Sequence, residues 1–230
     1  QDKLVCVLAV SGKLGGTNFG EDELLIVSNL ASQTAIAVEN ERLNRDAEET
    51  YLETISALAI AVEARDTYSR GHLDRVSQYS VRTAQKLGLD EQTIKDIKDA
   101  AELHDIGKIG ISDDILKKDS SLNEGEIRVM HKHPIIGEAI IKPVRRLSNL
   151  CDIVRHHHEW LDGSGYPDGL VGDEISIGAK ILCVVDAFDA MTIDRPYRKA
   201  LSIEAAKDEL KKYVGIRYDA KIVETFLSIL

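Results

Sequence analysis

Residues 101–108 read Ala-Glu-Leu-His-Asp-Ile-Gly-Lys and place an imidazole, a carboxylate and an ammonium group in one short, largely apolar stretch. The pattern predicts the end of a helix that stops near Gly107. His104 and Lys108 are spaced i, i+4 and would share a helix face, with Asp105 turned about 100° away from His104. Buried ionisable groups are costly unless they are paired or bind a metal. By itself the stretch also fits a plain helix end whose His and Lys favour the helix dipole.

Composition indicates an ordinary globular chain and argues against several functions. The 230 residues leave room for one full domain plus an appendage, with 43% hydrophobic and 30% charged residues. A net charge of −10 and 5% aromatic residues argue against binding nucleic acid polymers or membranes. Cys6, Cys151 and Cys183 are scattered, so no disulfide framework is expected. No apolar run is long enough to cross a bilayer and no leader precedes the chain, so we expect a cytoplasmic protein, although upstream residues could add an anchor.

The N-terminal part predicts a strand, a glycine-rich loop and a very long helix. Residues 4–10 are an apolar, β-branched run, and residues 11–16 contain three glycines. From 22 to 65 the helical pattern contains no Pro or Gly, a length typical of a coiled coil or signalling helix. We expect parallel homodimerisation along a loose seam on this helix. The seam consists of Leu43, Ala47, Thr50, Thr54 and Ala57.

The rest of the chain predicts an all-α bundle. Its expected helices after the long one are 72–87, 91–106, 112–116, 124–132, 134–142, 146–157, 175–192, 202–212 and 219–229. Gly88 and Gly110 are expected helix stops, and Asp219 is an expected helix cap. The main loops are then 66–71 and 159–174.

The histidines are clustered and suggest a metal centre. All seven lie between 72 and 158, namely His72, His104, His131, His133, His156, His157 and His158. The carboxylates that could join them are Asp105, Glu159, Asp186 and Asp189. Imidazole and carboxylate ligands without thiols suit Fe, Mn or Zn. His157 and His158 could each serve a different ion, and a pair of ions about 3.5–4 Å apart, bridged by Asp105 and a hydroxide, would suit phosphoester hydrolysis.

Several motifs together resemble a known family. His104 to Lys108 resembles the HD superfamily of metal-dependent phosphohydrolases, and residues 157–170, His-His-Glu-Trp-Leu-Asp-Gly-Ser-Gly-Tyr-Pro-Asp-Gly-Leu, resemble the signature of its HD-GYP subfamily. Further segments match that subfamily in order at 65–72, 131–134, 184–192 and 195–202. Residues 1–40 resemble the C-terminal end of a GAF sensor domain. The expected architecture is therefore a GAF-like α/β fragment at 1–40, a linker helix at 41–65 and an HD-type helical bundle at 66–230.

The resemblance implies a cyclic di-GMP phosphodiesterase that yields pGpG or GMP. The implied metal ligands are His72, His104, Asp105, His133, His157, His158 and Asp186, whereas His131 and His156 match no ligand position. Family members with a third metal carry a Glu four residues before the first His, where this chain has Tyr68. The expected cofactor is therefore two divalent ions, with Fe or Mn favoured.

Further residues have implied roles around the phosphate. Lys108 could add positive charge during catalysis, and Arg195 and Arg198 could fork onto a second phosphate or a guanine edge. Tyr166 could stack on a guanine or hold its loop against the bundle. The resemblance also implies that the 162–170 loop meets a partner protein. Asp189 is expected to orient a metal ligand.

The sequence leaves other functions open. The chain could hydrolyse another cyclic dinucleotide, or act as another HD phosphohydrolase on nucleotides, although the intact 157–170 signature disfavours the latter. It could also be a non-catalytic regulator that binds a cyclic dinucleotide.

Overall fold

The computed structural model describes residues 4–13, 18–65, 71–194 and 199–230, which divide into two compact units, 1–54 and 55–230. The α-helices are α1 (Glu21–Arg65), α2 (His72–Lys86), α3 (Glu91–Leu103), α4 (Asp113–Leu116), α5 (Glu124–Met130), α6 (His133–Ile141), α7 (Cys151–His156), α8 (Ile177–Thr192), α9 (Ile203–Lys212) and α10 (Ala220–Leu227). Three short 3-10 helices complete the described elements, η1 (Ile106–Gly110), η2 (Arg145–Leu150) and η3 (Gly172–Glu174).

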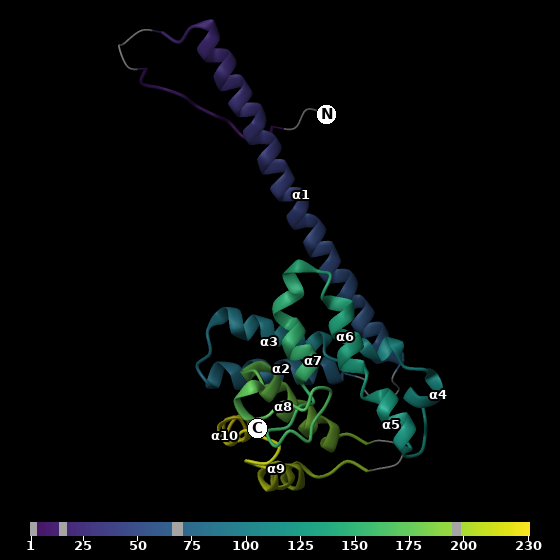
Figure 1. The fold of residues 1–230 in the computed structure, drawn as a ribbon. Coiled ribbons are helices and arrows are strands. Elements are labelled where there is room, and N and C mark those ends of the chain that lie inside the picture. Colours follow the sequence, from purple (N-terminus) through teal and green to yellow (C-terminus); the bar gives the residue numbers. More distant parts are fainter. Residues whose placement is uncertain (1–3, 14–17, 66–70, 195–198) are drawn as a thin grey trace. The chain divides into compact units, whose positions relative to one another are not determined.

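The first unit contains most of α1, a single continuous helix (Figure 1), as the uninterrupted periodicity predicted. The strand predicted over 4–10 is wrong, because these residues form no regular structure and their side chains are exposed. A strand needs a partner to satisfy its backbone, and the described residues provide none here. Leu24, Ile26 and Leu30 on α1 are also more than half exposed. Nowhere in the described chain is a helix long and apolar enough to cross a bilayer.

The second unit is a helical bundle around α8, as expected. This helix packs against α2, α3, α7, α9 and α10. Ile181, Leu182, Val184 and Val185 are fully buried along it, which explains a pattern that is apolar on nearly every face. The predicted absence of paired strands also holds for the described residues, which contain only isolated bridges, Asp162 to Val171 and Val214 to Tyr218.

Local signals place most helix ends within a few residues of their predicted positions. Asp219 caps α10 by accepting from the backbone N–H of Ile222 at 3.1 Å, as predicted. Gly88 follows α2 with a φ of 74°, the left-handed conformation that ends many helices. Gly110 is not such a stop, because it lies inside η1 and has no positive φ among the described glycines. The segment predicted as one helix over 146–157 is divided into η2 and α7.

The main difference between the predicted and the observed helices lies at residues 101–108. Helix α3 ends at Leu103, three residues earlier than predicted, and the chain tightens into η1. Gly107 allows η1 to lie directly on α6, because a Cβ there would be 1.9 Å from the carbonyl oxygen of His133 and 2.5 Å from the backbone nitrogen of Gly137. This contact brings the first turn of α6 against the residues that follow α3.

Candidate metal centre

The predicted metal ligands come mostly from helix ends. His72 and His133 begin α2 and α6, His104 and Asp105 follow α3, His157 and His158 follow α7, and Asp186 lies within α8. Side chains at helix ends can point along the helix axis into a common space. Five separate segments therefore converge on one site.

One half of the site is formed by His72, His104 and Asp186. Their ligand atoms all lie within 4.8 Å of one another. The Nε2 atom of His72 is 3.3 Å from Nε2 of His104 and 3.5 Å from Oδ1 of Asp186. Two imidazoles and a carboxylate facing one point are donors that first-row divalent metals accept.

The other half is formed by His133, His157 and His158, whose ligand atoms also lie within 4.8 Å of one another. The Nε2 atoms of His133 and His157 are 3.4 Å apart, and both residues are buried. Three imidazoles in contact, without a carboxylate among them, make a poor apolar core. They are well suited to sharing one cation.

Asp105 lies between the two halves. Its Oδ2 atom is 3.7 Å from Nε2 of His72 and 3.5 Å from Nε2 of His104, whereas its Oδ1 atom is 3.4 Å from Nε2 of His133. Each oxygen thus faces a different half. This arrangement is compatible with the bridging role that the sequence suggested for Asp105.

Hydrogen bonds fix how the rings present their nitrogens. The Nδ1 atoms of His104, His133 and His157 each lie 2.8 Å from the carbonyl oxygen three residues earlier. A carbonyl only accepts, so Nδ1 carries the proton and Nε2 offers its lone pair to the site. Sequence reasoning missed this repeated i−3 contact, which the helix-end positions could have suggested.

Asp189 holds the imidazole of His72 by a hydrogen bond. Its Oδ2 accepts from Nδ1 of His72 at 2.7 Å, and its Oδ1 accepts from Nε of Arg75 at 2.6 Å. Asp189 is nearly fully buried, so Arg75 compensates its charge. The orienting role expected of Asp189 is the one its geometry allows.

The electrostatics keep most of these groups in the form that binds metal. Burial lowers the pKa of His133 to about 4 and holds the pKa values of His157 and His158 well below the ordinary value. Burial opposes ionisation of Asp105, but Lys108 and the surrounding histidines bring its pKa well below the ordinary value. Neutral imidazoles and an ionised carboxylate are the metal-binding forms.

His72 differs from the other ligands. Burial lowers its pKa, yet the hydrogen bond that His72 donates to Asp189 and the charges of Asp186 and Asp105 outweigh burial and raise the pKa above the ordinary value. Without a cation, the carboxylates on this side of the site therefore favour a proton on His72. A bound metal ion would replace that proton.

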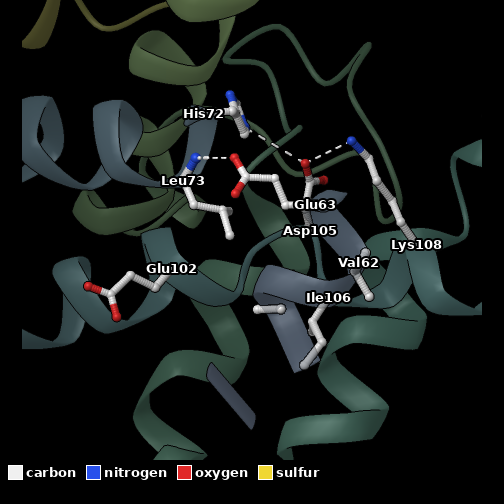
Figure 2. A pocket seen from close by; sticks show the side chains of 9 residues that line it. Val62, Glu63, His72, Leu73, Glu102, Asp105, Ile106 and Lys108 are labelled. Atoms are coloured by element: carbon white, nitrogen blue, oxygen red, sulfur yellow. Dashed lines mark hydrogen bonds and ion pairs between the residues drawn. The ribbon is translucent and has the colours of Figure 1, made fainter. Parts of the chain in front are cut away.

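Lys108 is paired with the bridging carboxylate. Its ammonium lies 2.7 Å from Oδ2 of Asp105 (Figure 2). The expectation that it shares a helix face with His104 is wrong, because α3 has already ended and the chain is a 3-10 helix. Residues three apart eclipse one another in that geometry, which aligns Lys108 with Asp105.

Tyr166 covers the His133–His157–His158 half. Its ring centroid is 4.7 Å from that of His158. The Tyr166 ring also stacks on His131, with ring centroids 3.7 Å apart and an interplanar angle of 5°. His131 belongs to none of the candidate ligand groups among the described residues. Its stacking role was not predicted, because nothing in the local sequence links residues 131 and 166.

Glu159 holds the loop that carries Tyr166 and is absent from the ligand groups of the described residues. Its buried carboxylate accepts from the backbone N–H groups of Asp168 at 2.6 Å, Gly169 at 3.0 Å and Leu170 at 3.2 Å. Gly165 packs so closely that a Cβ would be 2.4 Å from the backbone nitrogen of Trp160. Its φ is not positive, so close approach, and not an unusual backbone angle, requires glycine at this position.

His156 lies beside the centre without entering it, as expected. Its Nδ1 is 2.8 Å from Asp152, and its Nε2 is 3.0 Å from Oδ2 of Asp168. Arg195 and Arg198, and the Tyr68 position relevant to a third metal, lie outside the described residues.

Known proteins with similar sequences share this domain. The HD domain family model matches residues 35–222, and the chain belongs to that family. It is 40% identical to the cyclic di-GMP phosphodiesterase response regulator RpfG of Xanthomonas campestris pv. campestris, over 87% of this chain and 54% of that protein. It is 39% identical to the 3'3'-cGAMP-specific phosphodiesterase 2 of Vibrio cholerae, over 84% of this chain and 37% of that protein.

The chain therefore spans about half the length, or less, of these curated relatives. A solved structure, Bd1817, an HDG"Y"P protein from Bdellovibrio bacteriovorus, matches with a TM-score of 0.59 at 21% identity, over 83% of this chain and 63% of that one. At that identity the likeness concerns the fold alone.

Proposed function

We propose that the chain carries the catalytic domain of an HD-GYP phosphodiesterase that hydrolyses cyclic di-GMP to pGpG. Further cleavage of pGpG would give GMP. The observation that supports this most directly is Asp105, whose two oxygens face two separate histidine clusters. A site for one structural metal would need neither a second cluster nor a bridging carboxylate. The relationship to RpfG supports the choice of substrate.

The donor set suits two divalent ions, with Fe or Mn favoured. The proposed ligands are His72, His104, Asp105, His133, His157, His158 and Asp186. Such ions would supply an activated water and neutralise charge on the phosphate. No cysteine belongs to the candidate ligand groups of the described residues, and burial keeps His133, His157 and His158 neutral, which supports this assignment.

Residues around the centre would handle the substrate. Lys108 is close enough to Asp105 to add positive charge where the phosphate gains negative charge. Tyr166, stacked on His131 and lying against His158, would place its ring beside a proposed metal ligand, in reach of a bound substrate. Arg195 and Arg198 remain proposed phosphate or guanine ligands on the sequence argument.

A second candidate substrate is 3'3'-cGAMP, because a relative named for that specificity is almost as similar as RpfG. Both molecules are cyclic dinucleotides with two phosphodiester links, so the same centre could cleave either. The distinction must come from contacts to the bases, and a direct comparison of turnover of the two substrates tests it.

The proposal extends to the organisation of the whole protein. We propose a cytoplasmic homodimer formed along α1, with a GAF-like sensor fragment at 1–40 and a partner-binding surface at 162–170. The exposed apolar side chains of Leu24, Ile26 and Leu30 support an interface along α1. The size of a purified chain at micromolar concentration, measured by light scattering, tests the dimer, and a monomer would contradict it.

The experiment that tests the function is anaerobic reconstitution with Fe(II) or Mn(II). Metal per chain is counted, and cyclic di-GMP and 3'3'-cGAMP are followed separately by chromatography. We expect about two ions per chain, as dinuclear hydrolases require, and conversion of cyclic di-GMP to pGpG. His104→Ala and Asp105→Ala should abolish turnover, whereas His156→Ala, next to the ligands but outside them, should retain it.

Bound metal without turnover of any cyclic dinucleotide would overturn the proposal in favour of a non-catalytic regulator. Preference for 3'3'-cGAMP would replace the substrate and keep the reaction. About three tightly held ions per chain would refute the dinuclear assignment.

A further inference from the structure

The last turn of α1 reaches the first turn of α2, which carries His72. The Leu73 backbone N–H donates to Oε1 of Glu63 at 3.2 Å. Helix α2 begins at His72, and its N-cap residue, Gly71, has no side chain to accept from the exposed N–H groups of the first turn. A helix start needs such acceptors, and a negative charge there is favourable. Glu63 supplies both from another helix.

Glu63 also lies beside two of the proposed metal ligands. Its side chain lines the same hollow as His72, Asp105 and Lys108, and Figure 2 shows its carboxylate beside the first turn of α2. The hollow is closed from the α1 side by Ala59 and Val62, which are buried. The carboxylate that holds α2 therefore lies next to the residues that would hold the metal.

Arg65 fixes the end of α1 that carries Glu63. Its guanidinium donates to the carbonyl oxygen of Ile111 at 2.6 Å and to Oδ1 of Asp113 at 2.7 Å. It also reaches the carbonyl oxygens of Lys108 at 3.4 Å and Ile109 at 3.3 Å. Several acceptors around one guanidinium set both the position and the rotation of this helix end.

We propose that Glu63 is a positioning residue for the metal centre: by holding the first turn of α2, it aims His72 at the ion shared with His104 and Asp186. Arg65 is the clamp that keeps Glu63 in place. This inference rests on the proposed metal-dependent function. It also makes metal affinity sensitive to any displacement of α1, because that helix is continuous from 21 to 65.

The test measures Mn(II) binding by the full chain, following the spectrum of free Mn(II) by electron paramagnetic resonance. Glu63→Ala should weaken binding of one of the ions by about tenfold, the lower end of the effect of losing a residue that positions a metal ligand, because Glu63 acts on His72 through the backbone of Leu73. Glu63→Gln keeps an oxygen that accepts from Leu73 and should recover most of that loss. Arg65→Ala should weaken the same ion. Glu53→Ala removes an exposed carboxylate from the same helix and should bind as wild type.

If Glu63→Ala binds Mn(II) as wild type, even with a lower melting temperature, its role is only structural and the inference is overturned. An equal loss for Glu63→Ala and Glu53→Ala would also overturn it, because long-range charge would then explain the effect. A wild-type chain that binds manganese but cleaves no cyclic dinucleotide refutes the proposed function. The manganese titration of the variants then still tests the positioning role of Glu63. A wild-type chain that binds neither manganese nor iron overturns both.

Discussion

Replacing Glu159 by Gln is the sharpest test of how the Tyr166 loop is held. Glu159 is 1% exposed, and its carboxylate accepts three backbone N–H groups of the loop, those of Asp168, Gly169 and Leu170. Gln has almost the same shape but carries an oxygen on only one branch. If that oxygen takes the Oε1 position, two hydrogen bonds persist without charge. The NH₂ group then faces the Leu170 N–H, and two donors oppose each other.

The magnitude follows from these contacts. A hydrogen bond to a charged group contributes about 1.5–3 kcal/mol, and a buried donor left without a partner costs about 1–3 kcal/mol. Relief from burying a charge offsets part of this. We expect Glu159→Gln to lower the free energy of unfolding by about 2 kcal/mol. For a domain of this size that corresponds to a fall of about 4–8 °C in melting temperature.

Calorimetry, metal counting and kinetics together give the assay. Glu159 is absent from the candidate ligand groups, so the variant should keep its full metal content while kcat/KM falls as Tyr166 loses its fixed place beside His158. Unchanged melting temperature and activity would refute the account of the loop. Loss of one metal ion per chain would also refute the account of the loop, because Glu159 would then be a metal ligand.

Three further outcomes are expected. Gly107→Ala should destabilise the fold by about 3 kcal/mol, the upper end for overpacking, because the added methyl would meet the His133 carbonyl at 1.9 Å; normal chemical denaturation would contradict this. His157→Ala should lose bound metal, measured by elemental analysis, because His157 belongs to two candidate groups, whereas equal loss in His156→Ala would point to general damage. The raised pKa of His72 stabilises the metal-free fold at pH values below its ordinary pKa, and this contribution disappears as pH rises through the raised value. Metal must displace that proton, so Mn(II) affinity should rise as pH increases above the ordinary pKa of histidine, with proton release visible by calorimetry in two buffers; a flat profile would contradict it.

Much of the fold could be predicted because its signals are local. The start of α10 followed from Asp219, the end of α2 from Gly88, and the length of α1 from a run without Pro or Gly. The same reasoning failed at 4–10, where an apolar run has high strand propensity but no partner in the described chain. Propensity is a property of a segment, whereas a strand is a property of a pair.

The candidate site divides in the same way. The sequence by itself determined which residue types are available, since His104-Asp105 and His157-His158 sit at helix ends within long motifs. Only the tertiary structure decided that Lys108 pairs with Asp105 and that Glu159 holds a loop instead of joining the ligands. The reason is geometric. A motif fixes neighbours along the chain through backbone periodicity, but distances between side chains from different helices depend on how those helices pack, down to a contact such as that of Gly107 with the His133 carbonyl.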